Sequence, residues 1–158
     1  KRGEDLGYVG TFLKQFRDVA KLCDDQKIKI VSNAGGLNPA SMAAEVENII
    51  KELKLDLKVA YIDGDDLMPR LDELSSSGEK LKNIDKNNDL FSYEKKPLTA
   101  NAYLGAWGIK EALDNGADVV ICPRVTDAAV VIGPAAWKFN WSRNDYDQLA
   151  GALSLIHI

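Results

Sequence analysis

The chain has 158 residues, of which 46% are hydrophobic and 28% charged, a composition typical of one globular domain with its own core. Its formal net charge is −4 without a basic stripe, which argues against a nucleic-acid partner, and no apolar run is long enough to cross a membrane. We therefore expect a soluble, cytoplasmic protein that binds neither nucleic acid nor membranes.

Both ends of the sequence are unusual. It begins with Lys1 rather than methionine, and it ends in the unpatterned apolar letters LSLIHI. We therefore expect residues 1–153 to be a fragment of a longer protein, and residues 154–158 to be a truncation or read-through artefact.

Apolar periodicity predicts helices that alternate with strands in the first half of the chain. Residues 6–23 carry apolar side chains every three or four positions, as an amphipathic helix does. Strands are predicted over residues 27–32 and 57–62. The helix between them should begin at Pro39, with Asn38 as its cap.

The second half continues the alternation after one interruption. Residues 79–96 are polar and aperiodic, which predicts a long loop or excursion. The other predicted elements are a short helix at 67–74, a helix at 99–115, a strand at 118–122, a helix ending near 139 and a last helix at 145–153. This order predicts an α/β fold, Rossmann-like, whose parallel sheet carries helices on both faces and is incomplete at both ends.

Polar residues follow each predicted strand. In a parallel sheet these strand-to-helix loops share the carboxyl edge, where ligands bind. Arg124 could hold a carboxylate or phosphate through two parallel hydrogen bonds. The ligand-binding candidates are Asn33, Gly35, Gly36, Asn38, Asn101, Arg124 and Thr126. The catalytic candidates are Asp66 and Asp127, and the candidates for holding a metal, with Mg²⁺ as the suitable cation, are Asp63, Asp65 and Asp66.

Each of these features also has a purely structural explanation. The two glycines would serve a tight turn, since neither the dinucleotide fingerprint nor the P-loop pattern is present. Asp65 or Asp66 would cap a helix rather than bind a metal. Thr126 and Asp127 would likewise cap their helix, and Arg124 would pair with Asp127 or another acid.

The sequence lacks the residues for a nucleophile–histidine pair, and its cysteines do not have the spacing of metal ligands. His157 is the only histidine, so a serine or cysteine nucleophile has no histidine base elsewhere in the chain. The cysteines, Cys23 and Cys122, lie in apolar stretches without metal-ligand spacing, which favours reduced thiols. Cys122 ends a predicted strand, and we expect a buried structural thiol there rather than a nucleophile.

Five stretches together resemble the N-terminal domain of the acyclic terpene utilisation protein family. They are NAGGLNP, GDDL, ANAYLGAWGI, ADVVICPRVTDAAVVIGPAAW and DYDQLAGAL, in that order across residues 6–153. Two departures stand out. Pro123 replaces a glycine common before the family's RVTDA motif, which removes an amide that could face a ligand. The terminal LSLIHI also replaces a histidine-containing stretch.

The resemblance implies a role in the catabolism of citronellol- and geraniol-type compounds. In such pathways branched acyl-CoA thioesters are carboxylated, hydrated and cleaved. The chain would then be an enzyme, or an enzyme subunit, that acts on a branched acyl or terpenoid intermediate and binds its anionic group through Arg124 at the carboxyl edge of the sheet. The alternative is a non-catalytic ligand-binding or assembly subunit, associated with acyl-CoA carboxylase-type subunits.

Overall fold

The computed structural model describes residues 7–154. Leu6, the predicted start of the first helix, and residues 155–158 of the predicted artefact lie outside this range. Within it, no helix combines the length and the apolar character needed to span a membrane. The chain divides into two compact units. Asp66–Ala102 form the excursion unit, and the described residues on either side of this segment form the sheet unit.

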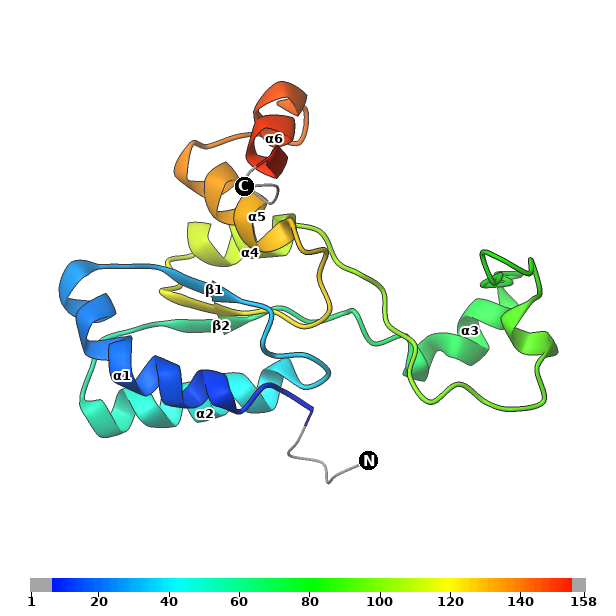
Figure 1. Cartoon of the computed structure of the whole chain (residues 1–158), viewed down its shortest axis with the longest axis horizontal. Helices are drawn as coiled ribbons and strands as arrows, with labels where there is room; N and C mark the ends of the chain where they lie inside the picture. Colours follow the sequence, from blue (N-terminus) through cyan, green and yellow to red (C-terminus); the bar gives the residue numbers. More distant parts are fainter. Residues whose placement is uncertain (1–6, 155–158) are drawn as a thin grey trace. The chain divides into compact units, whose positions relative to one another are not determined.

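Three parallel strands form the centre of the sheet unit (Figure 1). They are β1 (Ile30–Ser32), β2 (Val59–Tyr61) and β3 (Val119–Ile121), in the order β1-β3-β2. Val119 lies opposite Ile30 on one side and opposite Val59 on the other. The predicted parallel α/β fold is therefore confirmed, with strands shorter than the apolar runs that contain them.

Helices cover both faces of this sheet (Figure 1). Helices α1 (Thr11–Gln26) and α2 (Pro39–Leu53) pack against one face, and α4 (Trp107–Asp114) and α5 (Ala129–Lys138) pack against the other. α6 (Tyr146–Leu153) contacts α5. These layers protect the sheet from water on both sides, as parallel strands require.

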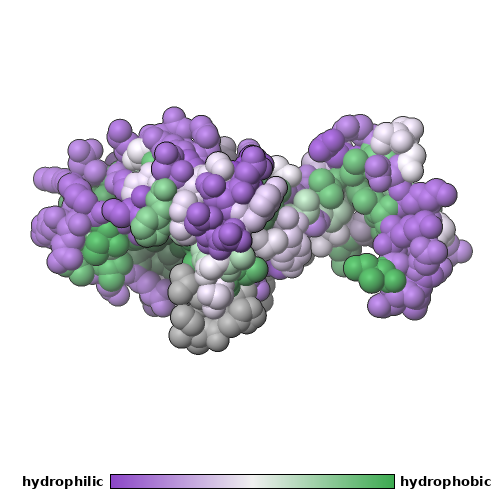
Figure 2. All heavy atoms as spheres, turned by 90° about the horizontal axis from the view of Figure 1, so that it is seen from above, coloured by the Kyte–Doolittle hydropathy of each residue, from purple (hydrophilic) through white to green (hydrophobic). Residues whose placement is uncertain are grey.

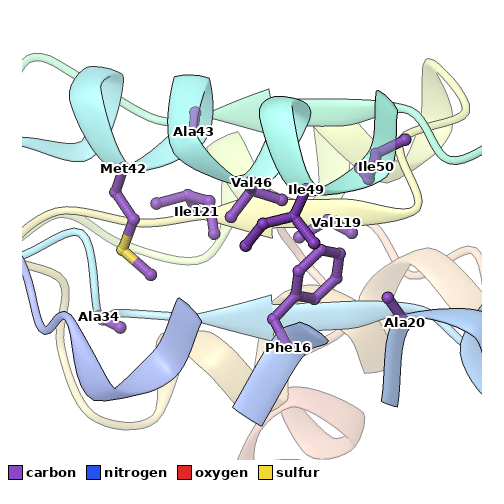
Figure 3. Close-up of a cluster of buried hydrophobic side chains, with 10 residues drawn as sticks. All are labelled: Phe16, Ala20, Ala34, Met42, Ala43, Val46, Ile49, Ile50, Val119 and Ile121. Carbon is purple, nitrogen blue, oxygen red and sulfur yellow. The ribbon is translucent and has the colours of Figure 1, made fainter. Parts of the chain in front are cut away.

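The side chains of β3 supply both halves of the core. Val119 and Ile121 point toward α1 and α2, whereas Val120 and Cys122 point toward α4 and α5. Figure 3 shows the first half, where Met42 and other apolar residues of α2 meet the strand. Because alternate residues of a strand face opposite sides, an uninterrupted apolar run is the expected sequence for this central strand.

The start of α2 follows the prediction. The Asn38 side chain accepts a hydrogen bond from the Ser41 amide at 3.2 Å, and Pro39 occupies the first helical position. Proline is suited to that position because its missing amide would have no partner inside the helix.

The predicted helix at residues 99–115 is wrong in its first half, because the observed helix begins at Trp107. Leu104 instead pairs with Val125 through a parallel bridge. The small side chains before Trp107 have helical spacing. The backbone there does not form a helix, because it hydrogen-bonds to residues that are distant in the sequence.

The excursion unit contains a 3₁₀ turn at Met68–Arg70, the short helix α3 (Leu71–Ser76) and a second 3₁₀ turn at Leu90–Ser92. None of its residues is classed as buried. Its ends are joined by a hydrogen bond from the Leu67 amide to the Ala100 carbonyl at 2.8 Å. Ile84 and Leu98 are 97% and 87% exposed, and exposed hydrophobic side chains of this kind interrupt a mostly hydrophilic surface (Figure 2).

Candidate functional site

The loops after the three strands are tied together at the carboxyl edge of the sheet. The Cys122 amide donates to the Ser32 carbonyl at 2.7 Å, which joins the end of β3 to the end of β1. The Ile62 amide donates to the Ile121 carbonyl at 2.9 Å, which joins β2 to the same place. Residues 33–38, 62–65 and 122–128 therefore begin from one fixed edge.

Two glycines allow the first loop to pack closely against its own chain. A Cβ added to Gly35 would lie 2.6 Å from the Cys122 carbonyl oxygen and 2.9 Å from Ile121 Cγ2. Gly36 has φ +56°, and a Cβ there would lie 2.5 Å from the Gly7 carbonyl oxygen. The structural explanation of the glycine pair is therefore sufficient: the loop needs two residues without side chains in order to fit.

The asparagines of this loop differ in their surroundings. The side chain of Asn38 caps α2, as described above. Asn33 is exposed, and its carbonyl accepts a hydrogen bond from the Gly36 amide at 3.3 Å. Of the two asparagines, Asn33 is thus the one whose side chain is exposed to the solvent beside the edge.

The acidic turn does not behave as one group. Asp63 is exposed, whereas Asp65 is only 5% exposed and accepts a hydrogen bond from the Arg124 amide at 3.4 Å. Asp66 belongs to the excursion unit, where its side chain accepts from the Met68 amide at 2.9 Å and its backbone forms a bridge with Asn101. Asp66 therefore stabilises the turn before Met68–Arg70, whose N-cap residue is Leu67, and Asp65 instead supports the arginine loop.

The metal role of Asp63, Asp65 and Asp66 stays a prediction, because Asp66 belongs to the excursion unit and the other two to the sheet unit. Within residues 7–154 no three histidine, cysteine, aspartate or glutamate side chains gather closely enough to hold a metal ion.

Arg124 is the exposed cation at this edge, directly beyond the central strand. Its Nη2 donates a hydrogen bond to the Tyr103 hydroxyl, and its Cζ lies 5.0 Å from the centre of the Tyr103 ring. Within the described residues Arg124 forms no ion pair, so the alternative in which it pairs with Asp127 is not observed. The guanidinium is therefore held by a neutral hydroxyl.

The backbone of Arg124 is also held by hydrogen bonds. Its carbonyl accepts a hydrogen bond from the Leu104 amide, and the Thr126 amide donates to the Leu104 carbonyl, each at 3.0 Å. The Arg124 loop is therefore bonded both to Leu104 and to Asp65.

Thr126 and Asp127 do not cap α5. The N-cap residue is Ala128, which makes no side-chain hydrogen bond, and both Thr126 and Asp127 are exposed. Their side chains therefore lie in the solvent between Arg124 and the start of α5. The amino end of a helix carries a partial positive charge, which adds to the charge of Arg124.

Cys122 is a structural residue, as predicted. It is fully buried, and burial raises the pKa of its thiol from 9.0 to about 12. At neutral pH the thiol stays protonated, and a protonated thiol is a poor nucleophile.

Sequence reasoning missed the contribution of Tyr103. The apolar spacing predicts a helix at Tyr103, whereas this residue lies in the segment that pairs with the Arg124 loop. The pairing joins residues that are 21 apart in sequence, so periodicity around Tyr103 carries no sign of it.

The whole chain, residues 1–158, matches the model of one protein family, the acyclic terpene utilisation family protein AtuA. Searches among curated proteins and among solved structures gave no match.

Proposed function

The chain belongs to the acyclic terpene utilisation family, and from this premise we propose that it binds an anionic acyl or terpenoid intermediate at the carboxyl edge of its sheet. The observation that carries the proposal is the exposed Arg124, whose backbone is fixed and whose side chain has a neutral tyrosine partner and forms no ion pair within residues 7–154.

A guanidinium in this state is suited to an anion. It offers five N–H donors in a planar fork, of which Tyr103 takes one. A carboxylate or phosphate can then accept two parallel hydrogen bonds from one edge of the fork. The Thr126 hydroxyl and the side-chain amide of Asn33 would add uncharged hydrogen bonds to the ligand. Asp127 is the carboxylate that could exchange a proton with it.

The proposal predicts that removing the Arg124 side chain weakens the binding of anionic ligands. Arg124→Ala should weaken binding of citronellate, used as the anionic probe, by about 1.5–3 kcal/mol, the range for a hydrogen bond to a charged group. Because Arg124 is exposed, the melting temperature should hardly change. Isothermal titration calorimetry and thermal unfolding measure the two quantities.

Two controls make the result specific. Arg17→Ala removes another exposed arginine, paired with Glu52 between α1 and α2, and should leave citronellate binding unchanged. Free coenzyme A serves as a second probe, since its phosphates offer the same charge from the other part of an acyl-CoA. Unchanged citronellate and coenzyme A affinities in Arg124→Ala, together with a large loss of stability, would reject the binding site.

A non-catalytic role in the same pathway is the second candidate. It is favoured by the protonated state of Cys122 and by the lack, within the described residues, of a histidine to act as a base. Such a subunit would act in the cytoplasm beside acyl-CoA carboxylase-type subunits. Mass spectrometry of the protein incubated with acyl-CoA esters and terpenoid acids, with and without magnesium, separates the candidates: binding without product supports this second one.

A further inference from the structure

We propose that Tyr103 is a positioning residue for Arg124, holding its guanidinium toward the ligand at the sheet edge. The inference rests on the proposed function, because it concerns the same anion site. It adds a residue whose predicted location, on a helix, gave no reason to expect such a role.

Tyr103 contacts the guanidinium in two different ways. Its hydroxyl accepts a hydrogen bond from Nη2, and its ring lies beside the cationic carbon at 5.0 Å. The hydrogen bond fixes a direction, the ring adds a cation–π contact, and neither contact neutralises the charge of the arginine. A carboxylate partner would instead neutralise the arginine and compete with an anionic ligand.

The backbone makes this contact rigid rather than incidental. Leu104, the next residue, exchanges hydrogen bonds with both Arg124 and Thr126, each at 3.0 Å. Tyr103 and Arg124 are therefore anchored to a common parallel bridge. Although Tyr103 is 59% exposed, its Cα cannot drift away from the arginine without breaking these bonds.

The remaining donors still form a complete binding edge. A guanidinium has two edges that can hold a carboxylate in parallel hydrogen bonds, and both include Nη2. One hydrogen of Nη2 points to each edge, so a single bond to the tyrosine hydroxyl occupies one edge and leaves the other free. Tyr103 thus selects which edge faces the ligand and restricts the rotamers of a flexible side chain before binding.

Removing only the hydroxyl tests this role. Tyr103→Phe keeps the ring and should weaken citronellate binding about three- to tenfold, the cost of ordering one long side chain on binding. Tyr146→Phe is the matched control, since Tyr146 is a 70% exposed tyrosine on α6. It should leave binding unchanged, and both variants should keep the melting temperature of the parent.

A double-mutant cycle distinguishes positioning from direct contact. In the Arg124→Ala background, Tyr103→Phe should cause no further loss of citronellate affinity, because there is no guanidinium left to position. A loss of equal size in both backgrounds would overturn the inference, since Tyr103 would then contact the ligand itself.

The cycle also separates this inference from the function on which it rests. If Arg124→Ala weakens citronellate binding and Tyr103→Phe does not, the anion site stands and the positioning role is rejected. If Arg124→Ala leaves binding unchanged, the anion site itself is rejected, and the role of Tyr103 with it.

Discussion

Gly35 and the Cys122 carbonyl lie so close together that a Cβ on the glycine would be 2.6 Å from the carbonyl oxygen. Real Cβ atoms do not approach backbone oxygens so closely, and the oxygen belongs to the rigid end of the central strand. The first and third loops of the candidate site are therefore in direct backbone contact.

Gly35→Ala should consequently destabilise the protein by about 1–3 kcal/mol, the usual cost of overpacking. Chemical denaturation measures the change. Gly151→Ala in α6 is the control, because a Cβ there meets no other group within 4 Å, and alanine is favoured over glycine in a helix. Equal stabilities for the two variants would contradict the packing described for Gly35.

Acid should weaken the ion pair at the opposite edge of the sheet. Burial alone would raise the pKa of Asp118, but hydrogen bonds from Lys29 at 2.8 Å and from the Lys58 amide at 2.9 Å hold this pKa below its usual 3.8. Since the folded-state pKa is the lower one, this contribution is full above the unfolded pKa and is lost as pH falls through the folded value.

Asp118→Asn should therefore cost about 1.5–3 kcal/mol of unfolding free energy at neutral pH and less in acid. Urea unfolding between neutral pH and pH values below about 4 measures the difference. Asp114→Asn removes an exposed carboxylate paired with Lys110 and serves as the control, with an expected change of roughly 0.3–0.5 kcal/mol. A pH-independent difference between the parent and Asp118→Asn would argue against this assignment.

The thiol of Cys122 should resist alkylation in the folded protein. It is fully buried, so the reagent cannot reach it. Its pKa is raised to about 12, so the thiol stays protonated at mildly alkaline pH. Iodoacetamide labelling followed by peptide mass spectrometry should find Cys122 unmodified in native protein and modified in guanidinium chloride. Rapid labelling of the native protein would instead support the nucleophile that the structure disfavours.

Limited proteolysis should begin within residues 79–96. None of these residues is classed as buried, and the one regular element among them is a single 3₁₀ turn at Leu90–Ser92. Trypsin has several lysines to cut there, and Lys110 on α4 provides an internal comparison. Early cleavage at Lys110 with an intact 79–96 segment would contradict the expectation.

Local sequence patterns were sufficient for much of the fold. The apolar run that ends in Cys122 indicated a strand, and Asn38 followed by Pro39 indicated where α2 begins. These signals are local, because they depend on side chains of neighbouring residues. The start of α4 was misjudged because the segment before Trp107 is held by a bridge to Val125, a partner on another loop.

The candidate site was predictable only in part for the same reason. Parallel strands imply a shared edge, which placed Asn33 and Arg124 together in the prediction. The burial of Asp65 and the contact between Tyr103 and Arg124 depend on backbone pairing across the fold, which no spacing in the sequence encodes. The sequence indicated a tight turn at Gly35 and Gly36. It did not indicate that these glycines pack against the backbone of Cys122 and Gly7.

The strand order β1-β3-β2 also constrains how the sheet can form. The first two strands do not pair with each other. Asp118, directly before β3, bonds Lys29 and Lys58, which are 89 and 60 residues away and lie directly before β1 and β2. Closing such long loops is entropically costly and slows folding. During synthesis β1 and β2 therefore lack the strand that lies between them, and part of the apolar surface of this region stays uncovered until β3 emerges.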